Sequence, residues 1–241
     1  MKIGILETGH LSDTLRANYG RYPAFFERLV GPHLPEAEFF AVSVVDGEQA
    51  ESPQQADGWI ITGSRSGAYD NEPWIPPLES FLRKCLAEKV PVVGICFGHQ
   101  VLAQAMGGEV VNSGKGWGVG IHDYRLSVQP DWLKEVPADF SIPAVHQDQV
   151  VSAPKGASVF ASSDFCPIAG LVYGDIDSPL AFSVQPHPEM SAAFVADLAD
   201  ERLQHIVPAE TMQKALESLN KPAHSLAWGK TIAKFFRKGR P

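Results

Sequence analysis

Cysteine is scarce in this 241-residue chain, and the three that occur, Cys85, Cys96 and Cys166, are widely spaced. Such spacing fits neither a disulfide framework nor a zinc site, so we expect a reduced, cytoplasmic protein without a metal. Runs of about 18 apolar residues are absent, which excludes a membrane-spanning helix. Residues 1–7 already include an acidic side chain, Glu7, and lack the apolar region of a signal peptide. With neither a membrane-spanning helix nor a signal peptide predicted, no membrane partner is expected.

Basic residues are also fewer than acidic ones. The chain has 20 Lys and Arg against 28 Asp and Glu, which gives a net charge of −8. Six of the basic residues lie within 221–241, where no acid occurs, so the rest of the chain is more acidic still. Non-specific nucleic-acid binding needs a basic footprint, so no nucleic-acid partner is predicted. The hydrophobic fraction of 44% is enough for a sizeable core and excludes a disordered chain.

Short apolar runs alternate with helix-compatible stretches over much of the chain. Buried parallel strands have continuous apolar sequences rather than alternating ones. Such runs occupy residues 2–7, 39–45, 58–62, 90–95 and 180–185. Helical patterns cover residues 22–30, 76–88 and 98–106. This alternation predicts an α/β fold, a flavodoxin-like, doubly wound, mostly parallel sheet with helices on both faces.

Residues 118–173 have a different pattern. Their short strand-like pieces are separated by Pro, Gly and Asp, which is typical of antiparallel meanders, and we expect a small antiparallel appendage there. The pieces are 121–128, 149–152, 158–161 and 168–173. No repeat or linker interrupts the chain, so residues 1–241 are predicted to form a single domain with a C-terminal helical extension over about 191–241.

The last predicted helix has an aromatic face and a basic face. Ser225 is a candidate N-cap and Gly239 a candidate stop. We expect a surface helix that packs its aromatic face on the domain, with docking to a partner or a membrane surface as the alternative. The aromatic face consists of Trp228, Ile232, Phe235 and Phe236, and the basic face of Lys230, Lys234, Arg237 and Lys238.

The strongest chemical signal is Gly94-Ile95-Cys96-Phe97-Gly98, which lies between a strand-like run and a helical pattern. This is the nucleophile-elbow pattern with Cys in place of Ser. The nucleophile sits on a sharp strand-to-helix turn, so the residues two positions away must lack a Cβ. The helix N-terminus behind the sulfur favours the thiolate. Cys96 is therefore the candidate nucleophile, whereas Cys85 and Cys166 lack such a context and are expected to be apolar fillers.

A cysteine nucleophile needs a base, and the base needs an orienting group. Of the eight histidines, His187 is the one that follows a predicted core strand with a carboxylate, Glu189, nearby. Pro188 keeps His187 out of a helix, so His187 and Glu189 project from the same side of an extended segment. His99 is expected to pack within the elbow helix. His146 lies in a predicted polar loop, where ligand contact and simple exposure remain equally open.

A glycine-containing loop, residues 62–67, follows the predicted strand 58–62. Its amides would line the carboxyl edge of the sheet, where ligands of open α/β sheets bind. An ordinary tight turn remains an equal alternative. Neither this loop nor residues 107–117 have the spacing of a Walker loop, so no nucleotide or other cofactor is predicted.

Residues 94–100 together with His187-Pro188-Glu189 resemble the class I (triad) glutamine amidotransferases, and above all the GMP synthase-like amidotransferase domain. Residues 61–64, 107–108, 116–121 and 146–150 are also similar, in chain order, so the resemblance covers about residues 58–190. It implies that Cys96 attacks the side-chain amide of glutamine and forms a γ-glutamyl thioester. His187 would transfer the proton, and Glu189 would orient His187.

The resemblance also implies which residues bind the substrate. The amides of Gly63 and Phe97 would form an oxyanion hole. Gln100, His146 and Gln147 would hold the α-amino and carboxylate groups of the substrate. Many family members have a Gly-Gly-Pro loop where this chain has Thr-Gly-Ser at 62–64, which weakens the assignment of Gly63.

Three functions remain open. Because no synthetase domain follows in this chain, a stand-alone amidotransferase would release ammonia, which a separate synthetase subunit would accept. Alternatively, a γ-glutamyl peptidase or hydrolase acting on glutathione-like compounds would need no acceptor. A catalytically silent regulatory module is least expected, because the triad pattern is intact. The family signature favours the amidotransferase, with glutamine or another γ-glutamyl small molecule as substrate.

Overall fold

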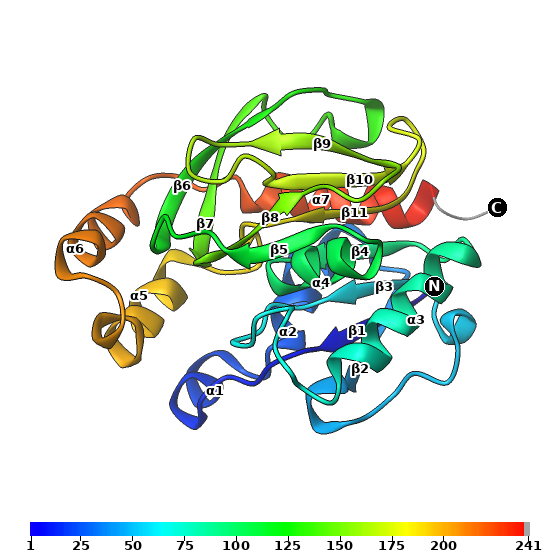
Figure 1. Ribbon diagram of the computed structural model, residues 1–241, viewed down its shortest axis with the longest axis horizontal. Coiled ribbons are helices and arrows are strands. Elements are labelled where there is room, and N and C mark those ends of the chain that lie inside the picture. The colour runs from blue at the N-terminus through cyan, green and yellow to red at the C-terminus, as the bar shows by residue number, and fades with distance from the viewer. Residues whose placement is uncertain (239–241) are drawn as a thin grey trace.

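Nine strands join in one sheet in the computed structural model, which describes residues 1–238 (Figure 1). Their order is β2-β1-β3-β4-β11-β10-β9-β6-β7. Five neighbouring strands are parallel: β1 (Lys2–Glu7), β2 (Glu38–Ser43), β3 (Gly58–Ile61), β4 (Val92–Ile95) and β11 (Pro179–Val184). The other four pair in antiparallel fashion: β6 (Gly118–Leu126), β7 (Asp139–His146), β9 (Ala157–Ser162) and β10 (Gly170–Gly174).

The expectation of a mostly parallel sheet with a small antiparallel appendage is confirmed only in part, because the antiparallel strands are as prominent as the parallel ones. Four strand pairs of the large sheet are parallel and four are antiparallel, so the sheet is mixed. The antiparallel strands continue the sheet, because β10 pairs with the free edge of β11 and satisfies its backbone groups. A separate two-stranded antiparallel sheet contains β5 (Glu109–Asn112) and β8 (Asp148–Ser152). The parallel strands keep the flavodoxin-like order.

Strand β7 is absent from the strand-like pieces expected between residues 118 and 173. It contains Pro143, and proline disfavours a central strand. The sheet order places β7 at an edge, where one side of the strand needs no ladder partner. Proline is tolerated in that position. The strand register pairs Gly118 with His146, which brings the end of β7 beside the start of β6.

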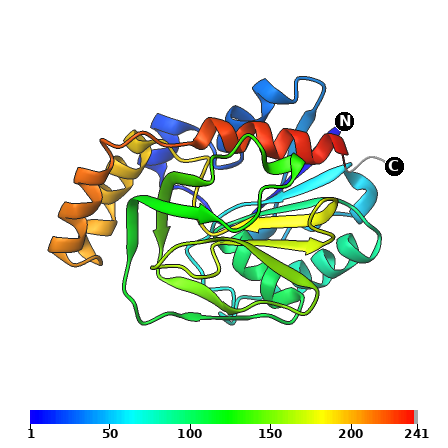
Figure 2. The same cartoon turned by 90° about the horizontal axis from the view of Figure 1, so that it is seen from above.

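Helices cover both faces of the sheet, as the alternation predicted (Figure 2). Isoleucines at alternate positions of β1, Ile3 and Ile5, point to one face, and Leu6 points to the other. The first face packs against α1 (Asp13–Tyr19), α2 (Pro23–Val30), α5 (Ala192–Glu201), α6 (Ala209–Ser218) and α7 (Ser225–Lys238). The second packs against α3 (Ile75–Ala87) and α4 (Phe97–Ala105). Short 3₁₀ turns occupy Gly31–His33, Val44–Asp46, Pro53–Gln55, Asp131–Leu133 and Leu203–His205.

The last helix, α7, packs on the sheet as predicted. Ser225, the candidate N-cap, is its first helical residue, so the helix begins one position earlier than expected. Its aromatic face, from Trp228 to Phe236, is buried. Its basic face pairs with acidic side chains of the same chain, since Lys234 and Lys238 lie 3.0 and 3.1 Å from Asp131. These contacts favour the packing role over docking to a partner. Gly239, the candidate stop, lies outside the described residues. Within residues 1–238, no helix has the length and apolar character needed to cross a membrane.

Candidate active site

The strand-to-helix turn lies where the glycine pattern predicted it. Strand β4 ends at Ile95, and helix α4 begins at Phe97. Cys96 between them has φ 53° and ψ −103°, a conformation that costs a non-glycine residue on the order of 1–3 kcal/mol. A Cβ on Gly94 would lie 2.5 Å from the Gly98 carbonyl oxygen, and one on Gly98 would lie 2.5 Å from that of Ile61. The elbow therefore requires both glycines.

Neighbouring strands carry Cys96 and His187 to the same edge of the sheet. Strands β4 and β11 are parallel neighbours, and His187 follows β11 as Cys96 follows β4. The His187 amide donates to the carbonyl of Pro143, 2.7 Å away, which fixes the backbone beside the edge strand. The His187 side chain lies close enough to Cys96 for the charge of the sulfur to raise its pKa. Its Nδ1 lies 2.6 Å from Glu189 Oε1, so Nε2 is the nitrogen left to face the sulfur.

Electrostatics favour a protonated His187. Burial alone would lower its pKa, but the negative charges of Cys96 and Glu189, with their hydrogen bonds, raise the pKa well above its ordinary value. Both side chains of the His187–Glu189 pair are almost fully buried, at 3% and 0% exposure. Water therefore screens the pair little. The arrangement suits an imidazolium held between a thiolate and a carboxylate.

Tyr22 joins this group, although the sequence pattern did not identify it. Its hydroxyl donates to Glu189 Oε1 over 2.9 Å and lies beside Gly63, where a Cβ would be 2.7 Å from it. Burial and the nearby charges of Glu189 and Cys96 raise the pKa of Tyr22 well above its ordinary value, so the hydroxyl stays neutral and can donate. Tyr22 and Glu189 are 167 positions apart, so no local pattern could have linked them.

Gln185 is a second residue that the sequence analysis did not select. Its Nε2 lies 3.5 Å from Cys96 Sγ, and the side chain is fully buried. The strand register pairs Val184 with Ile95, so the next residue along each strand also lies side by side. This register is the signal that could have identified Gln185 from a correct prediction of the strand order.

The predicted oxyanion donors lie next to Cys96 and His187. Phe97 directly follows Cys96 as the first residue of α4, where backbone N–H groups have no partner within the helix. Gly63 lies against His187, since a Cβ on Gly63 would be 3.0 Å from the imidazole Cε1. The hydroxyl of Tyr22 also lies close to Gly63.

The three residues expected to hold the substrate differ in their surroundings. Both N–H bonds of the Gln100 amide are used within the protein, towards Asp148 O at 2.9 Å and Gln185 Oε1 at 3.2 Å. Gln147 is partly exposed, and its Oε1 accepts from Asn112 over 3.1 Å.

The expectation that His146 lies in a polar loop is wrong. It is the last residue of β7 and is 4% exposed, because that edge strand pairs with β6 along its whole length. Burial and neighbouring histidines lower the pKa of His146 to about 3, so its ring is neutral. Its Nδ1 lies 3.2 Å from Asp148 O, and its Nε2 has no hydrogen-bond partner within residues 1–238.

The other histidine and cysteines considered in the sequence analysis, His99, Cys85 and Cys166, are buried in the core. His99 is buried between the Ser183 hydroxyl at 2.8 Å and the Ile168 carbonyl at 3.1 Å, in agreement with the expected packing role. Burial lowers the pKa of His99 to about 4. Cys85 and Cys166 lie in the two apolar cores, and burial raises the pKa of each thiol to about 12. Both thiols are therefore protonated fillers at neutral pH.

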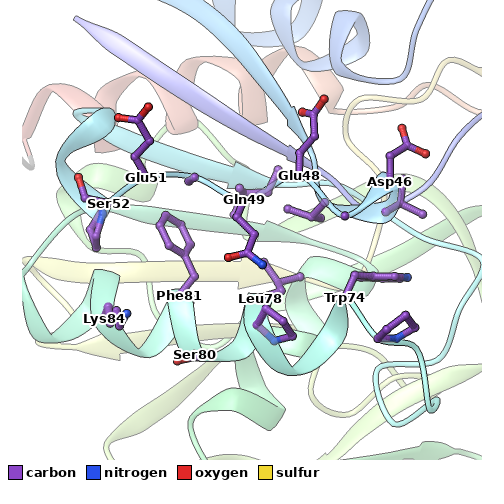
Figure 3. A pocket seen from close by; sticks show the side chains of 18 of the residues that line it. Asp46, Glu48, Gln49, Glu51, Ser52, Trp74, Leu78, Ser80, Phe81 and Lys84 are labelled. Atoms are coloured by element: carbon purple, nitrogen blue, oxygen red, sulfur yellow. The ribbon is translucent and has the colours of Figure 1, made fainter.

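Two of the hollows in the described part of the chain lie on opposite faces of the sheet. The smaller, about 80 Å³, is lined by His187, Tyr22 and Gly63 and opens beside the base. The larger, about 870 Å³, lies between the 44–54 loop and α3 (Figure 3). The loop contributes the acidic side chains Asp46, Glu48 and Glu51, and α3 contributes Leu78 and Phe81. None of the residues predicted to be catalytic lines this larger hollow.

The chain is similar to known proteins over most of its length. A family model described as glutamine amidotransferase class-I matches residues 37–194. Gamma-glutamyl peptidase 4 of Arabidopsis thaliana is 32% identical over 241 residues, which cover 95% of this chain and 92% of the relative. One subunit of the glutamine-hydrolyzing GMP synthase of Methanocaldococcus jannaschii is 31% identical over 144 residues, 60% of this chain and 70% of the relative. The crystal structure of a glutamine amido transferase from Methylobacillus flagellatus has a TM-score of 0.78 at 23% identity and covers 98% of this chain and 93% of its own, which shows a shared fold.

Proposed function

Because the chain belongs to the class I glutamine amidotransferase family, we propose that it hydrolyses γ-glutamyl amide bonds, with γ-glutamyl peptides as its preferred substrates. The observation that carries this proposal is the buried group of Cys96, His187 and Glu189, in which His187 Nδ1 lies 2.6 Å from the carboxylate. Support for the peptide substrate comes from similarity: the γ-glutamyl peptidase covers 95% of the chain, whereas the GMP synthase subunit covers 60%. This reverses the preference for an amidotransferase that the motifs alone suggested.

The reaction follows from the positions of the three side chains. The Cys96 thiolate attacks the γ-carbonyl carbon, and a C–S bond forms as the carbonyl electrons move to oxygen. The C–N bond then breaks while His187 Nε2 gives its proton to the leaving amine. Water, deprotonated by the now neutral His187, attacks the thioester and releases glutamate and the thiolate. Glu189 keeps Nε2 aimed at the sulfur throughout.

The developing oxyanion needs donors that are already in place. We assign this role to the Phe97 amide at the N-terminus of α4 and to the Gly63 amide beside His187. We assign the α-amino and carboxylate groups of the γ-glutamyl part to the side that carries Gln100, His146 and Gln147. Gln147 is the most accessible of these three residues.

A second function is that of an amidotransferase that passes ammonia to a separate synthetase. The similarity to the GMP synthase subunit, 31% identical over 144 residues, favours it. In that case the purified chain would need its partner for full turnover of glutamine.

The test compares glutathione, γ-glutamyl dipeptides and glutamine as substrates of the purified chain. The assay measures released glutamate, free amine and ammonia, with Cys96→Ala as the inactive control. We expect cleavage of the γ-glutamyl peptides without any added protein and little ammonia from glutamine. Faster turnover of glutamine than of every peptide would instead establish the amidotransferase.

A further inference from the structure

Two arginines line the small hollow beside His187. Arg65 lies in the loop that follows β3, and Arg202 directly follows α5. They come from segments 137 positions apart in sequence, yet both reach the hollow whose wall includes His187. The rest of the lining is largely apolar or glycine backbone, including Leu15, Phe194, Leu198 and Gly9.

Neither arginine side chain has an ion pair or hydrogen bond within residues 1–238. Arg65 is exposed, whereas Arg202 is partly buried, and burial together with the charge of Arg65 lowers the pKa of Arg202. The nearest acids of the β1 edge are already engaged, because Glu7 pairs with Arg21 at 2.8 Å and Asp46 with His10 at 2.9 Å. Two like charges held together without a counterion are repelled until an anion binds between them.

The hollow lies on the side of the site where the leaving amine would be. Its lining includes His187, which protonates that amine in the proposed mechanism, and includes neither Gln100 nor Gln147. A volume of about 80 Å³ has room for only a few non-hydrogen atoms, on the scale of a carboxylate with its neighbouring carbon. Ammonia as the leaving group would make no use of paired guanidinium groups.

We propose that Arg65 and Arg202 form a subsite for the carboxylate of the leaving amino acid or peptide. The proposal rests on the proposed function and narrows it: the substrates are γ-glutamyl compounds whose amine portion ends in a free carboxylate. Guanidinium groups are suited to this task because their planar donors match the two oxygens of a carboxylate. His10, which also lines the hollow, cannot replace them, because both its ring nitrogens contact acidic side chains.

The kinetic test uses γ-glutamylglycine and its C-terminal amide, which differ only in the negative charge. The wild-type chain is expected to prefer the acid. Arg202→Met and Arg65→Met should each lower kcat/KM for the acid by about tenfold to a hundredfold, mainly through KM, and change the amide by less than about twofold. The matched control is Arg125→Met, an exposed arginine on β6 that should leave both substrates unaffected. Equal losses on acid and amide, or no loss, would overturn the subsite.

A binding test separates this proposal from the proposed function. Calorimetry measures the affinity of γ-glutamylglycine and its amide for Cys96→Ala protein, and for the same protein carrying Arg202→Met. If the acid binds more tightly than the amide and this difference disappears with Arg202→Met, the subsite is supported. This holds even if the wild-type chain cleaves neither compound, an outcome that would reject the proposed function but not the subsite. Equal binding of acid and amide by Cys96→Ala protein would reject the subsite, whatever the activity. Circular dichroism and thermal melting of each variant establish that it is folded.

Discussion

At the scale of single residues, His187 stays protonated because two negatively charged groups lie beside it. The charges of Cys96 and Glu189 raise its pKa against the opposing effect of burial. The imidazolium form of His187 therefore persists to a higher pH than in a buried imidazole without these charges or in an isolated imidazole. The pH profile of the reaction should report this property directly.

Glu189→Gln tests the electrostatic role of the carboxylate. The substitution keeps a hydrogen-bond acceptor for His187 Nδ1 but removes a charge that raises the pKa of His187. The imidazolium should then lose its proton at a lower pH, so the alkaline limb of the kcat/KM profile should move towards acid. Rates measured from pH 5 to 10 provide the check, with the exposed Glu27→Gln as control. An unshifted alkaline limb would show that the charge of Glu189 does not set the protonation of His187.

Tyr22→Phe tests whether the tyrosine positions Glu189. The variant loses the 2.9 Å hydrogen bond to the buried carboxylate, and bonds to charged groups are worth about 1.5–3 kcal/mol. Because Tyr22 acts through Glu189 and His187, we expect kcat to fall about tenfold while KM changes by less than about twofold. Tyr19→Phe is a matched control, since its hydroxyl also donates to a carboxylate, Asp197, but at an exposed position. Similar kinetics for the two variants would exclude a positioning role for Tyr22.

At the scale of elements, the elbow and its neighbouring strands determine where the reactive atoms lie. Helix α4 approaches β3 and β4 so closely that Gly94 and Gly98 have no room for a side chain. The close approach is between backbone atoms, which cannot rotate away as a side chain could. The conformation of Cys96 therefore depends on two residues that do no chemistry.

Gly98→Ala should destabilise the protein and reduce activity. Its Cβ would lie 2.5 Å from the Ile61 carbonyl oxygen and 2.8 Å from the Ile61 Cβ, so strand and helix must separate. Overpacking of this kind costs about 1–3 kcal/mol, which urea unfolding measures. Gly31→Ala is the control, because its Cβ would meet only Phe39 at 3.9 Å and its φ of −52° suits alanine. Equal stability of Gly98→Ala and Gly31→Ala would contradict the steric account of the elbow.

At the scale of the whole molecule, the two apolar cores on either face of the sheet also bury ionisable groups. His99 and His146 are almost fully buried, and burial lowers their pKa values to about 4 and about 3. In the unfolded chain both would titrate near their ordinary value of about 6.5. The folded state thus resists protonation that the unfolded state accepts.

Acid should therefore destabilise the fold. Between about pH 6.5 and pH 4 the unfolded chain binds protons that the folded chain does not, so stability falls by about 1.4 kcal/mol per pH unit for each histidine. His187 does not offset this loss, because a raised pKa contributes stability that is already complete below the ordinary value. Urea unfolding at pH 7 and pH 5 measures the effect. His99→Gln should lessen the dependence, whereas the exposed His205→Gln should not. An unchanged slope in His99→Gln would assign the acid sensitivity to other groups.

The elements could be predicted from the sequence wherever the determining interactions are local. The predicted bounds of β1 match the structure to the residue. Those of β3, β4, β11, α2, α3 and α4 match within about two residues. These predictions succeed because the burial of a strand or of one helix face determines which of its own residues are apolar. The Cys96 elbow could be predicted because the strand-like run, the glycines and the helical pattern are consecutive in sequence. Gly94 has no room for a Cβ because of Gly98 within the elbow, whereas Gly98 has none because of Ile61 on β3. The spacing of His187 and Glu189 also records a local extended backbone.

Tertiary structure decided what depends on residues far apart in the chain. Pairing of β10 with the edge of β11 made the sheet mixed, and the edge position of β7 buried His146. The hydrogen bond of Tyr22 to Glu189 and the proximity of Arg65 to Arg202 each join segments more than 100 positions apart. No periodic pattern in the sequence links such partners. Their spacing along the chain depends on how the whole chain packs and not on the geometry of one strand or helix.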